Sequence, residues 1–145
     1  MGRKRIIDLY TLNNPEDTIR FGTYFAKQIR PKTIVALKGN LGAGKTTFVQ
    51  GFLQGLAISD LAQSPTFTFM QIYQGTVPIY HFDLYRLKSS EDFIALGFEE
   101  YIHSNAISMI EWPEIIQSIL PPHTLLIEFQ HEHIGRTAKV STWGN

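Results

Sequence analysis

The sequence contains no cysteine, carries no net charge and has no long apolar run. Without cysteine the chain forms no disulfide framework, no thiolate metal site and no thiol nucleophile. No apolar run approaches the roughly 20 residues that a transmembrane helix needs. Lys and Arg number 13, as do Asp and Glu, so the formal net charge is zero. The strong positive field of an autonomous nucleic-acid binder is therefore missing.

What the chain does have is the balance of a globular domain. Its 145 residues are 43% hydrophobic and 18% charged, and a domain commonly holds about 100–200 residues. We expect one domain over residues 1–145. The N-terminus begins with basic residues, but Asp8 follows after only two Ile residues, so we expect no signal peptide and a soluble, cytoplasmic protein.

Strand-like and helix-like segments alternate along the chain. Asn14 before Pro15 is a typical helix start, and the predicted helix closes before Pro31. The apolar run 33–37 predicts a strand buried on both faces. Further helices are predicted at 45–56 and from residue 90, and further strands at 66–73, 77–84, 106–110, 123–130 and 136–142. This alternation, with a hairpin around residues 74–76, predicts an α/β fold with a mixed sheet.

The most informative segment lies between the strand at 33–37 and the next predicted helix. It reads Gly39, Asn40, Leu41, Gly42, Ala43, Gly44, Lys45, Thr46 and Thr47. This run satisfies the phosphate-loop pattern G-x-x-x-x-G-K-[ST] in the strand–loop–helix context that the pattern requires. Glycines let backbone N–H groups converge on phosphate oxygens, Lys45 reaches the β- and γ-phosphates, and the Thr46 hydroxyl is a Mg²⁺ ligand. The segment therefore predicts binding of a nucleoside triphosphate.

Two further features concern the base and the metal. The guanine-reading tetrapeptide Asn-Lys-x-Asp is absent from the chain, which favours ATP. A phosphate-loop enzyme also needs an acid at the end of a neighbouring strand to hold Mg²⁺ directly or through water. Glu111 ends the apolar strand predicted at 106–110 and suits this role, while Asp83 is the competing candidate. From the residues alone the choice stays open.

Four motifs together point to a family. They are Gly39–Thr47, Ser64–Thr68, His81–Leu87 and Glu111–Pro113, in this order. With these motifs the chain resembles the TsaE (YjeE) family of small bacterial ATPases, which serve the enzymes that make threonylcarbamoyladenosine on tRNA. The resemblance covers nearly the whole chain. It implies a P-loop NTPase-like single domain with a mixed, largely parallel central sheet flanked by helices and antiparallel strands.

The resemblance also implies roles for individual residues. Glu111 is implied as the Mg²⁺ ligand that works with Thr46, and Asp83 as a residue near the γ-phosphate that assists hydrolysis. With Lys45 these two acids form the implied catalytic set. Thr11 lies where the family approaches the nucleotide base.

Two of the motifs carry further implications, and two positions depart from the family pattern. The segment 64–68 is similar to a switch over the nucleotide, and Trp112 matches a tryptophan that the family needs for function.

Asn40 stands where the family usually has Asp, and Gln50 where an Arg is common. The loss of one acid and one base nearly cancels in charge, so the departures concern loop tightness and partner docking more than ATP binding.

The resemblance implies that this ATPase is weak alone and works with partners. In the family it acts with TsaB and TsaD, of which TsaD carries out the threonylcarbamoyl transfer, and the ATPase resets their complex between turnovers. We therefore expect ATP and Mg²⁺ as cofactors and TsaB- and TsaD-type proteins as partners. We expect contact with tRNA only through that complex, and none with membranes.

Two other function classes remain open. A small-molecule kinase usually needs an acceptor pocket and an Arg-rich lid, but the chain has only six Arg and none cluster beyond the N-terminus. A nucleotide-gated binding module with little turnover is the second alternative, because one domain alone leaves the nucleotide open to water. Hydrolysis measured with and without the partner proteins separates these readings from the ATPase.

Some charged and titratable residues allow two interpretations. The stretch 91–114 holds six acids and no Lys or Arg, which indicates either a solvated helix face or a docking surface for a basic partner. His131 and His133 are more often solvated than metal-bound at such spacing. His81 shares a strand face with Asp83 and either hydrogen-bonds near the nucleotide or orients the strand.

Overall fold

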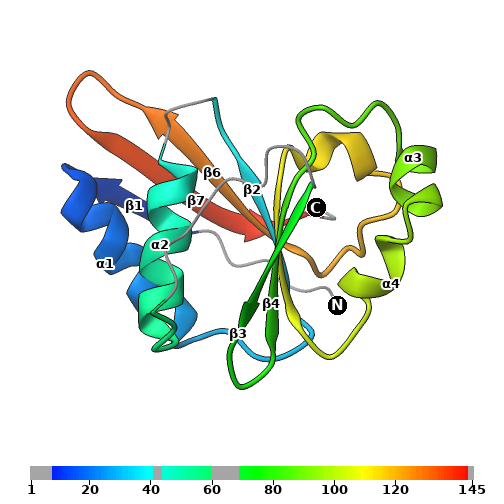
Figure 1. Ribbon diagram of the computed structural model, residues 1–145. Helices are drawn as coiled ribbons and strands as arrows, with labels where there is room; N and C mark the ends of the chain where they lie inside the picture. The colour runs from blue at the N-terminus through cyan, green and yellow to red at the C-terminus, as the bar shows by residue number, and fades with distance from the viewer. Residues whose placement is uncertain (1–7, 41–43, 60–68, 144–145) are drawn as a thin grey trace, which may run out of the picture.

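The computed structural model describes residues 8–40, 44–59 and 69–143. The elements in chain order are β1 (Asp8–Leu12), α1 (Pro15–Ala26), β2 (Ile34–Lys38), α2 (Lys45–Gly55), β3 (Met70–Gln74), β4 (Pro78–Asp83), α3 (Ser90–Ala95), α4 (Glu99–Ile102), β5 (Ile107–Glu111), the 3-10 turn η1 (Pro113–Ile116), β6 (Leu125–His131) and β7 (Arg136–Thr142) (Figure 1). All seven strands belong to one sheet of order β1-β7-β6-β2-β5-β4-β3.

The centre of the sheet is parallel and its two edges are antiparallel. Strand β2 pairs in parallel with both β5 and β6, and β4 pairs in parallel with β5. Antiparallel pairs join β3 to β4 at one edge and β6, β7 and β1 in series at the other. Parallel strands need crossover connections and buried faces, which the apolar run of β2 satisfies. The α/β fold with a mixed sheet is therefore confirmed.

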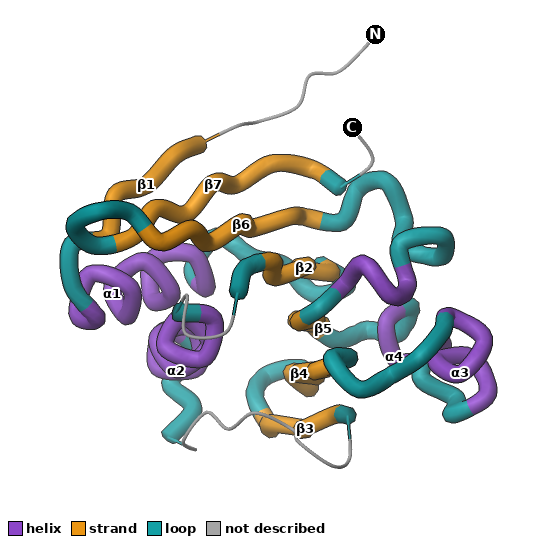
Figure 2. The backbone as a smooth tube through the Cα atoms, turned by 90° about the horizontal axis from the view of Figure 1, so that it is seen from above, coloured by secondary structure: helices purple, strands orange, loops and turns teal. Residues whose placement is uncertain are grey.

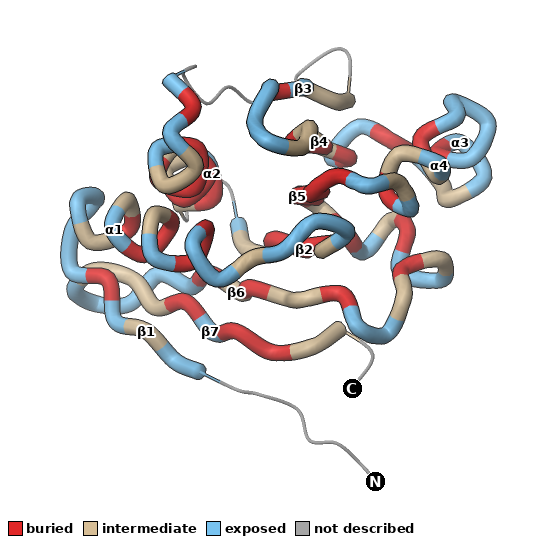
Figure 3. Tube along the Cα trace, turned by 90° about the horizontal axis from the view of Figure 1, so that it is seen from below, coloured by how far each residue is buried: buried red, intermediate tan, exposed pale blue. Residues whose placement is uncertain are grey.

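Helices cover both faces of this sheet. Helices α1 and α2 lie together on one face, and α3, α4 and η1 lie on the other (Figure 2). Because strand side chains alternate between faces, neighbouring residues of β2 enter different cores: Ile34 faces α3 and α4, and Val35 faces α1 and α2. The buried residues concentrate in the central strands and in the inner sides of the helices (Figure 3).

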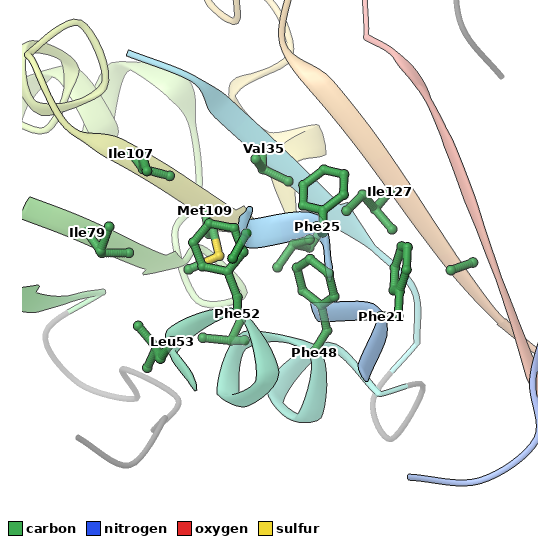
Figure 4. Close-up of a cluster of buried hydrophobic side chains, with 14 of the residues drawn as sticks. Phe21, Phe25, Val35, Phe48, Phe52, Leu53, Ile79, Ile107, Met109 and Ile127 are labelled. Atoms are coloured by element: carbon green, nitrogen blue, oxygen red, sulfur yellow. The ribbon is translucent and has the colours of Figure 1, made fainter. Parts of the chain in front are cut away.

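Aromatic side chains connect α1 and α2 in the core between these helices and the sheet. Phe21 and Phe25 of α1 meet Phe48 and Phe52 of α2, with ring centroids 5.3 Å apart for Phe21 and Phe48 (Figure 4). Such tilted and edge-on ring pairs add to the hydrophobic stabilisation of the core. The cluster anchors α2, which begins with Lys45, to the sheet.

The two helices approach so closely that glycine is needed between them. A Cβ atom at Gly22 of α1 would lie 2.4 Å from the carbonyl oxygen of Phe48 and 2.8 Å from the amide nitrogen of Phe52. No side chain fits this space without separating the helices. The position of α2, and with it the start of that helix at Lys45, therefore depends on the α1–α2 contact.

The structure adds elements that the sequence did not predict. Strand β1, helix α4 and turn η1 were not expected; each is short, and β1 is an edge strand whose first residues are exposed. The first predicted helix ends at Ala26, well before Pro31. The strand predicted at 66–73 begins at Met70, and residues 66–68 lie outside the described residues. Short elements of this kind carry little periodic signal.

Candidate active site

The carboxyl ends of three adjacent strands bring the candidate acids together. Glu111, the last residue of β5, is in register with Leu37 of β2 on one side and with Asp83 of β4 on the other. The two competing acids are therefore neighbours at one edge of the sheet. In open α/β sheets, ligands bind outside this carboxyl edge.

The described residues between β2 and α2 lie at the same edge. Gly39 and Asn40 follow β2, and Gly44 caps α2 with a positive φ of 108°, which side chains other than glycine rarely adopt. The predicted contacts of Leu41, Gly42 and Ala43 lie outside the described residues. Because Lys45 is the first residue of α2, the loop delivers its side chain beside the positive end of the helix dipole.

The ammonium group of Lys45 is buried and has several neighbours. Its Nζ donates a hydrogen bond of 2.7 Å to the carbonyl oxygen of Gly39 and lies 3.8 Å from Oε1 of Glu111. It also lies 4.4 Å from the centre of the Trp112 ring, within cation–π range. Lys45 is 5% exposed and Glu111 4%. The attraction between the Lys45 ammonium and the Glu111 carboxylate offsets part of the free energy that is lost when each charge is removed from water.

His81, which was not among the predicted site residues, forms a hydrogen bond with the second carboxylate oxygen of Glu111. His81 is fully buried, and its Nε2 atom lies 2.6 Å from Oε2 of Glu111, so the ring donates to the carboxylate. His81 Nδ1 is buried with no hydrogen-bond partner in the described part of the chain. His81 therefore contacts Glu111, one of the predicted site residues. The sequence signal was its position two residues before Asp83, on the same strand face.

Asp83 lies at the rim of this cluster. Its Oδ1 accepts a hydrogen bond of 3.0 Å from the backbone N–H of Tyr85. Burial raises the pKa of the Asp83 carboxyl above its usual range, and the nearby charge of Glu111 acts in the same direction. The Tyr85 N–H, His81 and Lys45 oppose this rise in pKa. Asp83 thus holds its proton more tightly than a free carboxyl does.

Trp112 closes the site next to Glu111. Its backbone is in the left-handed region, with φ of 59°, where a bulky residue is a genuine outlier. Its ring packs on Tyr85 with centroids 4.9 Å apart, and its buried Nε1 has no hydrogen-bond partner in the region that the structure describes. Strained backbone of this kind clusters at functional sites, and here it presents the indole face to Lys45.

The remaining predicted residues lie around this cluster. Thr46 is exposed and Thr47 half-buried in the first turn of α2. Thr11 is exposed on the edge strand β1, opposite Thr137 of β7. It does not join the cluster of Lys45, Glu111 and Asp83, because β7, β6 and β2 lie between β1 and β5 in the sheet. The predicted switch at 64–68 lies outside the described residues.

A cavity of about 510 Å³ adjoins the cluster. It opens at the ends of β2 and β6 and is lined by Gly39, Asn40, Trp112, Glu128 and His131, among others. This volume falls within the usual range of small-molecule pockets, about 300–1,000 Å³.

The described residues contain no group of three or more His, Asp or Glu side chains that could hold a metal ion by themselves. Mg²⁺ in nucleotide sites is usually held by one or two protein ligands together with phosphate oxygens and water, which Thr46 and Glu111 could match. Within the same residues, no helix is long and apolar enough to cross a membrane.

Comparisons with known proteins agree with this architecture. A crystal structure of Bacillus subtilis YdiB superposes with a TM-score of 0.83 at 32% identity, covering 99% of this chain and 90% of that one. Proteins named tRNA threonylcarbamoyladenosine biosynthesis protein TsaE are similar in sequence. The one from Treponema pallidum is 41% identical over 79% of this chain and 85% of its own length, and the one from Haemophilus influenzae is 39% identical over 84% and 81%.

The match to the family as a whole is equally broad. The profile of the family described as Threonylcarbamoyl adenosine biosynthesis protein TsaE matches residues 12–139, from the end of β1 into β7. That range contains Lys45, Asp83 and Glu111. The chain belongs to the TsaE family.

Proposed function

We propose that this protein is a Mg²⁺-dependent ATPase that supports threonylcarbamoyladenosine modification of tRNA together with TsaB- and TsaD-type proteins. The proposal depends mainly on one buried ion pair. Lys45 at the start of α2 and Glu111 at the end of β5 face each other, with Nζ and Oε1 3.8 Å apart. A lysine at a helix N-terminus and an acid at the end of the adjacent strand are the two charged parts of a phosphate-loop site.

Lys45 would bind phosphate by exchanging partners. Its ammonium now donates to the Gly39 carbonyl and faces Glu111 and Trp112. A phosphate oxygen attracts the ammonium more strongly than the Gly39 carbonyl does, because the phosphate carries a full negative charge and adds Coulomb attraction to the hydrogen bond. Backbone N–H groups at the start of α2 would add the remaining donors.

Thr46 and Glu111 would hold the metal ion. Glu111 is well prepared for this, since His81 and Lys45 each face one of its oxygens and restrict its rotation. When bound, Mg²⁺ neutralises charge that develops on the phosphates. Asp83, with its raised pKa and its position beside Glu111, would orient water near the γ-phosphate and accept its proton.

The family relationship supports the biological part of the proposal. Relatives over most of this chain carry the name of a tRNA threonylcarbamoyladenosine biosynthesis protein. We place the protein in the cytoplasm. Because its own net charge is zero, it would contact tRNA through its partners. The ATPase would reset the partner complex between turnovers.

The test compares ATP binding and hydrolysis, with and without TsaB and TsaD. Lys45→Ala should weaken ATP binding by at least 100-fold, because it removes a buried charge-assisted contact. Glu111→Gln should lower Mg²⁺-dependent turnover more than ATP binding. Lys27→Ala, at an exposed lysine just after α1, is the matched control and should leave both unchanged. If Lys45→Ala bound ATP as the unchanged protein does, the proposed site would be wrong.

The 510 Å³ cavity beside the loop is consistent with a second candidate, a small-molecule kinase. The same experiment separates the two. Stimulation of hydrolysis by the TsaB–TsaD pair supports the ATPase, and transfer of phosphate to a metabolite supports the kinase. ATP binding without turnover in either setting would indicate a nucleotide-gated binding module.

A further inference from the structure

His81 lies on the sheet face that α2 covers, between the apolar core and the candidate acids. In the parallel pair of β4 and β5, His81 is in register with Met109, and Asp83 with Glu111. Ile79, two residues before His81 on the same strand face, and Met109 belong to the apolar core beneath α2 (Figure 4). His81 is therefore the first polar side chain of β4 beyond that core.

The His81 ring makes one close polar contact. Its Nε2 atom lies 2.6 Å from Oε2 of Glu111, the residue is fully buried, and no described residue offers its Nδ1 atom a hydrogen bond. A buried ring nitrogen without a partner is destabilising. An apolar side chain would avoid that loss, so packing alone does not account for a histidine at this position.

The two carboxylate oxygens of Glu111 are held unequally. Oε2 has the short contact with His81, whereas the Nζ atom of Lys45 lies 3.8 Å from Oε1, which is longer than a hydrogen bond. In the proposed function Lys45 turns to a phosphate, while the contact of His81 with Oε2 needs no change. Oε1 is then the oxygen of Glu111 that faces the start of α2.

We propose that His81 is a positioning residue: by holding Oε2 of Glu111, it leaves Oε1 as the single oxygen that binds Mg²⁺. This inference rests on the proposed function, in which Glu111 is a ligand of that ion. Hydrogen-bond partners of metal-binding carboxylates fix the orientation of the ligand, and their loss typically weakens metal affinity or activity by about 10- to 100-fold.

The same contact bears on the choice of ion. A carboxylate with one oxygen already occupied binds a metal through the other oxygen alone. Mg²⁺ takes few protein ligands in near-octahedral geometry, whereas Ca²⁺ accepts about six to eight oxygens and often both oxygens of one carboxylate. His81 would therefore favour Mg²⁺ over Ca²⁺.

The test measures, by calorimetry, the Mg²⁺ and Ca²⁺ affinities of the protein bound to a non-hydrolysable ATP analogue. His81→Leu should weaken Mg²⁺ binding by about 10- to 100-fold and Ca²⁺ binding less. The affinity for the analogue in EDTA should stay unchanged. His81→Gln should keep most of the Mg²⁺ affinity, because its amide nitrogen is as many bonds from the backbone as Nε2 of histidine and can donate to Oε2. His123→Leu, at an exposed histidine before β6, is the control and should behave normally.

Two results would overturn the role of His81. The first is a loss of analogue affinity in EDTA as large as the loss of Mg²⁺ affinity, since His81 would then only support the packing of the site. The second is an equal loss in His81→Gln and His81→Leu, or an unchanged ratio of Mg²⁺ to Ca²⁺ affinity in His81→Leu. Should His81→Leu not fold, His81→Asn replaces it, because its amide is one bond too short to reach Glu111; equal Mg²⁺ affinity in the Asn and Gln variants would then overturn the proposal.

Failure of this inference differs from failure of the proposed function. If the unchanged protein bound no nucleotide, or bound it without taking up Mg²⁺, the proposed function would be wrong and the role of His81 with it. If the unchanged protein took up Mg²⁺ with the nucleotide and His81→Leu did so equally well, only the role of His81 would be wrong.

Discussion

Three titratable side chains meet at Glu111, and their mutual effects shape the site. Glu111 faces His81 at 2.6 Å and Lys45 at 3.8 Å, while Asp83 is its partner in the neighbouring strand. Two carboxylates at one site disfavour each other's ionisation. For Asp83, burial and the nearby charge of Glu111 both raise the pKa of the carboxyl. The two acids thus differ in environment, which is the usual basis for dividing a metal-binding role from a proton-accepting one.

The raised pKa of Asp83 predicts a pH-dependent effect of Asp83→Asn on stability. In the unfolded chain this carboxyl ionises near pH 3.9, and burial raises the pKa in the folded protein. A raised folded-state pKa adds stability at low pH, and that stability is lost as pH rises through the folded pKa. Asparagine cannot ionise and escapes this loss. The free energy of unfolding of Asp83→Asn should therefore rise relative to that of the unchanged protein as the pH increases above the pKa of the unfolded chain.

Urea unfolding at a series of pH values checks this prediction. Asparagine keeps an oxygen that accepts the Tyr85 N–H, so the local hydrogen bond is retained in the comparison. Glu91→Gln, at an exposed acid of α3, supplies the background trend. A stability difference for Asp83→Asn that is flat with pH, or that moves against the variant, would show that burial does not penalise this carboxylate.

At the scale of elements, the site depends on where α2 begins. Helix α2, which begins with Lys45, is held by the aromatic core and by its close contact with α1. Any change that separates the two helices moves Lys45 relative to Glu111, which belongs to the sheet. Displacements of about 1 Å are enough to disturb a site of this kind.

Gly22→Ala should therefore lower both stability and nucleotide affinity. The added methyl would lie 2.4 Å from a backbone oxygen of α2, and overpacking of this kind costs about 3 kcal/mol. Gly97→Ala is the control, since no atom lies within 4 Å of its added methyl and only the positive φ of 81° opposes it, for about 1 kcal/mol. Denaturant unfolding and ADP titration measure the two effects. Equal losses in both variants would mean that the helix contact is not tight.

Sequence patterns located the long elements well and the short ones poorly. Strands β2 and β5 and helix α2 lie within a residue or so of their predicted bounds, because continuous apolar runs and helical spacing report burial directly. Strand β1 was not predicted because an edge strand with exposed residues is held by backbone hydrogen bonds to β7. Backbone pairing of this kind has no signature in the side chains.

Across the whole molecule, acidic and basic residues are equal in number but unevenly distributed along the chain. The stretch 91–114 carries acids only, and the structure splits these acids into two groups. Glu111 faces Lys45, and Glu114 lies 3.9 Å from Lys38. The other four acids belong to α3 and α4, away from these lysines in sequence and in the fold. An exposed pair such as Lys38–Glu114 contributes little stability.

This distribution predicts weak tRNA binding by the protein alone. Phosphate-backbone binding requires many Lys and Arg contacts, and non-specific affinities lie at about 1–100 μM at physiological salt even for basic proteins. We expect a Kd weaker than about 10 μM in a gel-shift assay at 150 mM salt. Replacing Arg3, Lys4 and Arg5 by Ala tests whether the basic N-terminus accounts for what binding remains. A Kd below 1 μM for the unchanged chain alone would contradict the assignment of tRNA contact to the partners.

Local sequence patterns were enough to predict a phosphate-loop motif, the α/β class and the short set of candidate acids. These depend on local patterns: glycine spacing, apolar runs, and an acid where a strand ends. The pairing of Glu111 with Asp83, and the contacts of His81 and Lys45 with Glu111, could be seen only once the chain was folded. These contacts join strands and a helix that are far apart in the chain. Their geometry follows from sheet register and helix packing, which no short segment encodes.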